Sequence, residues 1–437
     1  MNKYINQYLG FLSLILPLAI NAQILSSNGG TVFINTGGQI HCNGGVEINN
    51  SSTFINNGEL RTTKNATGTL AGTLSINSVS SINGSGNYFV EQDWVNNASF
   101  NANTSSVYLY GNTEQLITSA NGTITEFNNL ILQGNGAGNN RKKTLQNVDA
   151  RVSLTGNLQI NDRELATETN SMIVLNPSTT AISNSQVITN EGFVSSLPPG
   201  YLSWSSNSNS PYIFPLGSSD GTLRYRPIII EPKSTVPNTY YGRLHNTTGD
   251  TYGYNLSQHD TEIETLNSSF FHSIEQELGA TNADVSIAYL PSEDGDWSTI
   301  AQWNNTSVMW NSIAPTSTSN IGNYNALQKA DWDFTNPAHP YVLVNLENEL
   351  SIPNVFTPNQ DGTNDLYTVN GKGITEYNIV IVNRWGNVVF ESNDITDSWD
   401  GTSNGTPCVE GVYFYSIKAK SLTQEYDKQG HITLNVN

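Results

Sequence analysis

The chain is poor in cysteine and in charge, above all in positive charge. Its 437 residues include 2 cysteines, Cys42 and Cys408, which fall in segments that we interpret as separate domains, so a disulfide-stapled scaffold is excluded. Only 18 residues are basic, against 37 acidic ones, and the formal net charge is -19. Because nucleic-acid binding depends on basic side chains that neutralise phosphates, this balance argues against nucleic acid as a partner.

Long apolar runs and local catalytic motifs are also lacking. The longest apolar run, Tyr8 to Ile20, is too short for a transmembrane span, and we expect no transmembrane segment in the mature chain. The 6 histidines form no HxH or HExxH pair, and the sequence has no GxSxG elbow, P-loop or dinucleotide-binding GxGxxG. The sequence therefore predicts a protein that is not an enzyme and that has no certain cofactor.

Polar, uncharged and turn-forming residues are abundant instead. Glycine contributes 36 residues, and apolar residues make up 37% of the chain. This composition favours short strands joined by turns over helices, and it leaves enough apolar side chains for an extensive core. The negative charge is concentrated in residues 250–350, where 14 acidic residues accompany one basic residue, Lys329. We predict an all-β fold of several domains, with an acidic surface suited to solubility outside the cell.

The N-terminus has the pattern of a secretory signal peptide over residues 1–22. Lys3 supplies a positive charge, the run from Tyr8 to Ile20 supplies the apolar segment, and cleavage is expected between Ala22 and Gln23. The sequence therefore predicts a chain that crosses the inner membrane and loses this segment.

Residues 23–195 consist of short alternating strands separated by Gly, Asn and Ser, as in TVFINTGG, QIHCNGG, VEINNSS and TFINNGE. We predict a β-helix-like solenoid of parallel strands, and a stack of small β-sandwiches is the alternative. Three apolar residues are predicted to point into its core: Ile34, Ile48 and Ile55. Three asparagines that closely follow the strands are predicted to form ladders along the stack: Asn35, Asn49 and Asn56.

Residues 196–349 differ in composition from the preceding segment, because Pro, Tyr and Trp are frequent. They are predicted to form one acidic, aromatic-rich β-sandwich. The stretch from Pro211 to Ile230 predicts a hairpin. Glu293, Asp294 and Asp296 form an acidic turn, which indicates either a hairpin tip or a calcium site. Five tryptophans are predicted to lie mostly in the core, with stacking on sugar rings as the alternative: Trp204, Trp297, Trp303, Trp310 and Trp332.

The last segment, residues 350–437, contains about seven short strands in fewer than 90 residues, which suggests an immunoglobulin-like β-sandwich. Ile379 to Val382 is an unbroken β-branched run, typical of a strand that is covered on both faces. Val412 and Phe414 alternate with Tyr413 and Tyr415, as in a strand with two different faces. The group from Arg384 to Asn387 lies between two apolar runs and predicts a hairpin turn.

The motifs of this segment are FTPNQDGTND, NRWG, WDG, GVYFY and a terminal GHITL, in that order. The ordered set resembles the gliding-motility-associated C-terminal domain of Bacteroidetes, which is the type B sorting domain of the type IX secretion system. The resemblance covers nearly all of residues 350–437. The chain departs from the family pattern in ending ITLNVN rather than in a basic residue, and in having Gln429 where lysine is common. The matching residues are Phe356, Pro358, Asp361, Gly362, Asn364, Asp365, Arg384, Trp385, Gly386, Trp399, Asp400, Gly401, Gly411 and Tyr413.

The resemblance implies that the type IX translocon at the outer membrane exports the chain to the cell surface or the medium. The core of the sorting domain is predicted to include Trp385 and Trp399. The remainder of the chain resembles repetitive β-rich surface proteins of the same bacteria only weakly, and it predicts an adhesive or structural role with a glycan or another surface ligand as partner. The alternative is a carbohydrate-binding or carbohydrate-active protein similar to polysaccharide lyases with a β-helix.

Two clusters could carry chemistry. Oxygen-bearing side chains around a glycine turn suit calcium, and an Asx-rich turn that bonds its own backbone is the alternative; the cluster consists of Asn359, Asp361, Asn364 and Asp365. The basic group Arg141, Lys142 and Lys143 could supply the base of a lyase. Because the acidic residues before residue 250 are scattered, a solvated loop is the preferred interpretation of the basic group.

Overall fold

The computed structural model describes residues 24–64, 72–77, 79–188, 190–313, 316–334, 340–346, 350–359, 361–371, 373–421 and 425–436, and the backbone of 20–22. Most of the signal peptide predicted for residues 1–22 therefore lies outside the described residues. Strands dominate, and the helical segments in the described ranges are η1 (Gly138–Arg141), η2 (Gly249–Tyr252) and α1 (Pro291–Asp294). The predicted all-β fold class is confirmed.

Two units divide the chain. The first comprises residues 1–253, 268–295 and 318–341, and the second comprises residues 254–267, 296–317 and 342–437. The predicted domain limits at residues 195 and 349 stay predictions.

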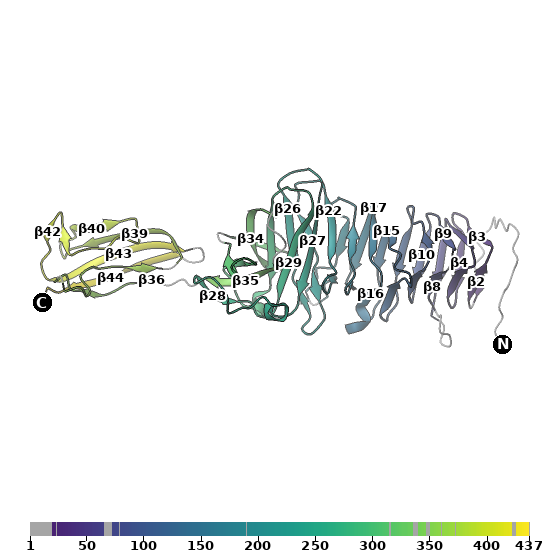
Figure 1. The fold of residues 1–437 in the computed structure, drawn as a ribbon, viewed down its shortest axis with the longest axis horizontal. Helices are drawn as coiled ribbons and strands as arrows, with labels where there is room; N and C mark the ends of the chain where they lie inside the picture. The colour runs from purple at the N-terminus through teal and green to yellow at the C-terminus, as the bar shows by residue number, and fades with distance from the viewer. Residues whose placement is uncertain are drawn as a thin grey trace. The chain divides into compact units, whose positions relative to one another are not determined.

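The first unit (Figure 1) begins with short strands that pair in parallel within three sheets, and the first of these sheets continues in the antiparallel pairings described below. The first sheet orders β1 (Ile20–Ala22), β4 (Gln39–Cys42), β7 (Glu59–Thr62), β10 (Asn87–Val90), β13 (Ser106–Leu109), β15 (Thr125–Leu132), β17 (Ala150–Asn161), β19 (Met172–Val174) and β22 (Leu202–Ser206). The second orders β2 (Leu25–Asn28), β5 (Val46–Asn49), β8 (Leu74–Ile76), β11 (Trp94–Asn96), β14 (Gln115–Thr118), β16 (Lys142–Gln146), β18 (Glu164–Ala166) and β21 (Phe193–Ser195). The third orders β12 (Ser99–Phe100), β9 (Ser81–Asn83), β6 (Thr53–Asn56) and β3 (Thr31–Ile34), and β20 (Ile182–Asn184) pairs with β17. The chain thus visits the sheets in rotation, while the finer β-helix interpretation stays a prediction.

The core of these sheets comes from alternate residues of each strand. Ile34 and Ile48 are buried as predicted, but Ile55 is only half-buried and that part of the prediction is wrong. Its neighbour Phe54 takes the inward position in β6, and because successive side chains point to opposite faces, Ile55 faces outward. The alternating pattern therefore located the strand but not which of its faces is buried.

Asparagine side chains form a ladder along the parallel sheets, as predicted for Asn49. Its Oδ1 accepts a hydrogen bond from Asn77 Nδ2 at 3.0 Å, and Asn77 Oδ1 accepts one from Asn97 Nδ2 at 3.1 Å. Asn56 is buried and bonds backbone instead, donating from Nδ2 to the Asn87 carbonyl at 2.9 Å. The three rungs that contain Asn49, Asn77 and Asn97 are thus joined by side-chain amides as well as by strand pairing.

The first unit continues in antiparallel pairings. β22 pairs with β27 (Asn238–His245), which pairs with β29 (Phe271–Leu278). A separate five-stranded sheet orders β23 (Tyr212–Phe214), β26 (Ile228–Pro232), β30 (Ala283–Tyr289), β34 (Tyr324–Trp332) and β33 (Ser317–Ile321). The short strands β24 (Gly217–Ser218) and β25 (Arg224–Tyr225) pair with each other. The antiparallel pairing of β23 with β26 confirms the hairpin predicted between Pro211 and Ile230.

The second unit contains two groups of strands. One comprises β28 (Ile263–Leu266), β31 (Thr299–Asn304), β32 (Met309–Ser312) and most of β35 (Pro340–Leu346), with β28 antiparallel to β35 and β31 antiparallel to β32. The other is the C-terminal segment, where a five-stranded sheet orders β37 (Val355–Phe356), β44 (Glu425–Leu434), β43 (Gly411–Ser421), β39 (Ile374–Val382) and β40 (Val388–Ser392). Two short pairs accompany this sheet: β36 (Leu350–Ser351) with β38 (Asn370–Gly371), and β41 (Thr402–Ser403) with β42 (Thr406–Pro407). The immunoglobulin-like topology stays a prediction.

Candidate functional site

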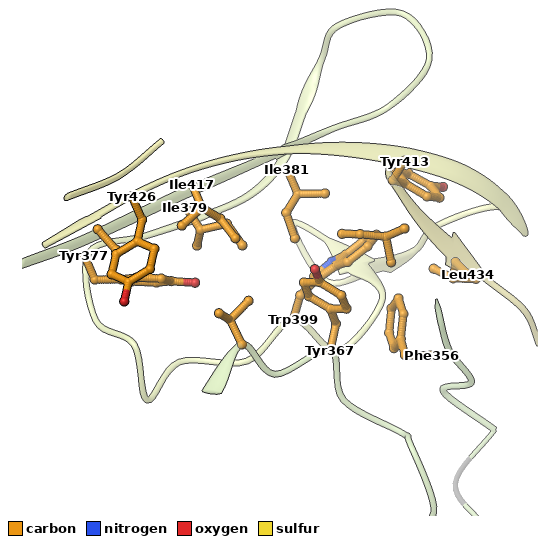
Figure 2. Packing of buried hydrophobic residues seen from close by; sticks show 13 residues of the cluster. Phe356, Tyr367, Tyr377, Ile379, Ile381, Trp399, Tyr413, Ile417, Tyr426 and Leu434 are labelled. Carbon is orange, nitrogen blue, oxygen red and sulfur yellow. The ribbon is translucent and has the colours of Figure 1, made fainter. Parts of the chain in front are cut away.

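The C-terminal segment buries aromatic rings from its sequence motifs against one face of the five-stranded sheet. Figure 2 shows Phe356, Tyr367 and Trp399 grouped together, with Ile381 pointing toward them from β39. The Trp399 ring is 1% exposed and lies 5.1 Å from the ring centroids of both Phe356 and Tyr413. Its Nε1 donates a hydrogen bond to the Thr402 carbonyl at 2.8 Å, so the polar edge of the indole is also satisfied. The FTPN, WDG and GVYFY motifs therefore meet in one core.

The WDG motif makes the turn that follows this tryptophan. Asp400 Oδ1 accepts the backbone N–H of Thr402 at 2.9 Å, and Gly401 has a φ of +78°. A Cβ atom on Gly401 would lie 3.0 Å from Pro358 Cγ, so a side chain here would have to displace the FTPN loop slightly as well as adopt a positive φ. The Tyr413 hydroxyl donates to the Val409 carbonyl at 2.7 Å, which fixes the entry into β43 that begins at Gly411.

The FTPNQDGTND loop uses its polar side chains to bond its own backbone. Asp361 Oδ1 accepts the N–H of Thr363 at 2.8 Å, and Asp365 Oδ2 accepts the N–H of Gly362 at 2.8 Å. Asn359 Oδ1 accepts the N–H of Asp361 at 3.2 Å, and Asn364 has a positive φ of 54°. This geometry is that of consecutive Asx turns. Within the described ranges, no group of three or more His, Cys, Asp or Glu is placed to hold a metal ion.

Chelation of calcium is expected to leave the stability of this loop unchanged. Because its carboxylates accept backbone N–H groups, thermal melting curves of the purified protein should coincide with and without a chelator. Asp361→Ala should lower the melting temperature slightly and equally in both conditions, since it removes the acceptor of the Thr363 N–H. A chelator-induced drop in the wild type that Asp361→Ala abolishes would instead establish a calcium site.

The NRWG motif forms the turn between β39 and β40, which confirms the predicted hairpin turn. Asn383 Oδ1 accepts the N–H groups of both Trp385 and Asn387 at 3.0 Å, and Gly386 has a φ of +79°. The Trp385 side chain is 79% exposed, so its predicted place in the core is wrong. The reason is geometric: the five-residue turn extends beyond the paired strands, and the Trp399 indole already lies in the core.

The two faces of the sheet differ as the alternation in β43 predicted. Tyr413 and Ile417 are buried, whereas Val412 and Phe414 are exposed on the opposite face. The prediction that the β-branched run in β39 is covered on both faces is wrong, because Val380 and Val382 are only half-buried. This outward apolar face was missed by the sequence reasoning, although the apolar residues on both sides of β43 were a signal for it.

Residues 350–434 match the family model described as the CHU_C Type IX secretion signal domain. The resemblance to a type IX sorting domain is thereby confirmed. No curated protein and no solved structure matches the chain. We refer to residues 350–434 as the sorting domain; its match implies handling by the type IX secretion system and export to the cell surface or into the medium. In the described part of the chain, no helix has the length and apolarity needed to cross a membrane.

Outside the sorting domain, the basic cluster is not the solvated loop that the sequence predicted. Lys143 lies in β16 with a side chain that is 0% exposed, and its Nζ donates to the Gly111 carbonyl at 2.9 Å and to Gln115 Oε1 at 2.5 Å. Burial lowers its pKa to about 7. Arg141 Nε donates to the Asp162 carbonyl at 2.9 Å. The prediction failed because the aliphatic stem of Lys143 occupies an inward strand position, and an amine held this way is closed to a polysaccharide.

The acidic turn predicted around Glu293 is a short helix engaged in ion pairing. The Asp294 carboxylate lies 2.5 Å from Arg226 Nε, and Glu293 Oε2 lies 2.8 Å from Arg226 Nη2. Arg226 and Asp294 are both fully buried, and His272 Nε2 bonds the Arg226 carbonyl at 2.9 Å. The turn is therefore neither a plain hairpin tip nor an open calcium site.

The tryptophans of residues 196–349 belong to the core, as the preferred interpretation had it. Trp297 is half-buried, and its four companions are buried: Trp204, Trp303, Trp310 and Trp332. The rings of Trp303 and Trp310 pack on each other at 5.5 Å. Buried rings offer no face to a sugar, so these residues lend no support to glycan stacking.

Proposed function

We propose that the chain is an exported, non-enzymatic protein with an adhesive or structural role at the cell surface or in the medium. Residues 1–22 act as the signal peptide for the inner membrane, and the sorting domain acts as the address read at the outer membrane. Residues 23–349 are the cargo, whose task is to present a stable β-rich surface to a partner outside the cell.

The match of residues 350–434 to a type IX secretion signal domain carries this proposal. The packing of the sorting domain supports it, because the FTPN, WDG and GVYFY motifs build one aromatic core around Trp399. The domain is thereby a folded address, distinct from the short apolar segment at the N-terminus.

Features of the cargo region favour a structural role over catalysis. Its parallel sheets support the β-helix interpretation, and their amide ladders suit a long, rigid body. Its unusual charged groups, Lys143 and the Arg226–Asp294 pair, are buried and bonded to neighbouring groups. Groups held in this way are bonded within the interior and do not face a substrate.

The proposal is tested by fractionation of cells that express altered chains. Deleting residues 350–437 should leave a folded cargo trapped in the periplasm, whereas deleting residues 1–22 should keep the chain in the cytoplasm. Grafting residues 350–437 onto an unrelated periplasmic reporter should send the reporter to the surface or the medium in cells that have the type IX system. Normal export of the truncated chain would show that the segment is not the export address.

A further inference from the structure

The outer face of the sorting-domain sheet carries a row of three apolar residues and one histidine at the end near the NRWG turn. Val388, Val382, Phe414 and His431 are register partners on β40, β39, β43 and β44, so their side chains lie side by side on one face. Val388 is 52% exposed and Phe414 is 48% exposed. Val412 lies on the same face two residues from Phe414 and is similarly exposed. We use the term apolar face for four residues of the sheet, Val382, Val388, Val412 and Phe414, together with Trp385 of the adjoining turn.

The far end of the same outer face has the opposite character. There Asn378, Lys418 and Asp427 are register partners, and Lys420 lies 3.7 Å from Glu425. The outer face is therefore divided into a charged half, which resembles an ordinary solvated sheet, and an apolar half. A contiguous apolar patch that is exposed to solvent marks a site of interaction.

Trp385 lies in the rigid turn that joins β39 to β40, three residues from Val382 and three from Val388 in the chain. The two hydrogen bonds to Asn383 Oδ1 and the positive φ of Gly386 fix the backbone on both sides of the tryptophan. An exposed indole on a preorganised turn loses little conformational entropy when a partner binds it, and tryptophan is among the residues that dominate binding energies. The indole contributes nothing to the core, although it belongs to a motif through which the domain resembles its family.

We infer that the apolar face is the surface by which the type IX secretion apparatus holds the sorting domain. The inference rests on the proposed function, because a domain that acts as a secretion signal requires a receptor. The receptor presents a concave apolar surface that takes the Trp385 indole and covers Val388 and Phe414. The exposed Arg384, next to the indole, calls for an acidic group at the rim of that surface.

The test is export of the full-length chain with single substitutions on and off the apolar face. Trp385→Ala should reduce the exported fraction about tenfold or more, in the range of an interface hot spot, and Val388→Ser should reduce it less. Val409→Ala changes an exposed apolar side chain outside the sheet and should leave export unchanged. Trp385→Tyr keeps an aromatic ring on the turn and should restore part of the export that Trp385→Ala loses.

Three outcomes separate this inference from the proposed function. If the Trp385→Ala variant is exported as well as the wild type, while deletion of residues 350–437 blocks export, the inference alone is overturned. If the chain that lacks residues 350–437 is still exported, the proposed function is overturned. If Trp385→Ala lowers the melting temperature of the purified protein, Val388→Ser decides, and its normal export at wild-type stability also overturns the inference. The wild-type chain could instead self-associate through this face. If Trp385→Ala abolishes that self-association without affecting export, the face binds a second copy of the chain and the inference is also overturned.

Discussion

Replacing Trp399 by alanine is expected to unfold the sorting domain and to stop export. The substitution removes a fully buried indole that touches Phe356 and Tyr413, and it removes the hydrogen bond to the Thr402 carbonyl. Truncation of a buried tryptophan typically costs about 3–5 kcal/mol. Small domains have total stabilities of about 5–15 kcal/mol, so this loss would leave the domain marginally folded or unfolded.

The matched control for this change is Trp385→Ala, which removes the same side chain from an exposed turn. Its effect on stability should stay within about 0.5 kcal/mol, as is usual for surface positions. Hydrogen exchange of the β43 and β44 amides in the full-length protein would report the opening free energy of the sorting domain in both variants. Equal protection in Trp399→Ala and Trp385→Ala would contradict the assignment of Trp399 to the core.

The stability of the first unit is expected to rise with pH between about 7 and 10 because of Lys143. Folding lowers the pKa of this lysine from 10.5 to about 7, chiefly through burial, with a smaller contribution from Arg163. Between these two values the unfolded chain binds one more proton than the folded chain, so the folded state gains stability as the pH rises. Below pH 7 both states are protonated and the penalty for burying the charge is fully present.

Comparison with Lys143→Met isolates this contribution from other titrating groups. The variant lacks the lysine charge, so its stability relative to the wild type should fall by about 2–3 kcal/mol between pH 6 and pH 9. The loss of the donor to the Gly111 carbonyl and to Gln115 Oε1 does not depend on pH and cancels in the comparison. Urea unfolding followed by tryptophan fluorescence gives the free energies of unfolding. If the difference in this free energy between the variant and the wild type does not change with pH, burial does not lower the pKa of Lys143.

Local patterns predicted the strands and turns of this protein well, and they predicted its buried faces less reliably. The run TFINN contains two adjacent apolar residues, Phe54 and Ile55, and only the pairing with neighbouring rungs decides that Phe54 faces inward. The rung length could not be predicted from the sequence either, because parallel register partners are separated by as few as 18 residues, from Ile82 to Phe100, and by as many as 30, from Met172 to Leu202.

The sorting domain shows the same limit at the level of its motifs. NRWG and WDG both place a tryptophan near a glycine in a turn, and their order allowed the family to be predicted. Whether the indole points into the core depends on contacts with residues far along the chain, such as Phe356 and Tyr413 for Trp399. The prediction for Lys143 failed for a related reason, since the carbonyl that accepts its hydrogen bond belongs to Gly111 on another rung.

The change of pairing direction at strand β22 affects whether neighbouring molecules of this protein can add to one another. On one side it pairs in parallel with β19, and on the other it pairs in antiparallel fashion with β27. A parallel stack that simply ended would expose a row of unpaired N–H and C=O groups, to which the first rung of another molecule could add in the same direction. By reversing the chain direction at β22, the protein closes this edge with its own sequence. This edge of the sheet is thereby protected against end-to-end growth into fibres, which matters for a protein that carries a secretion signal.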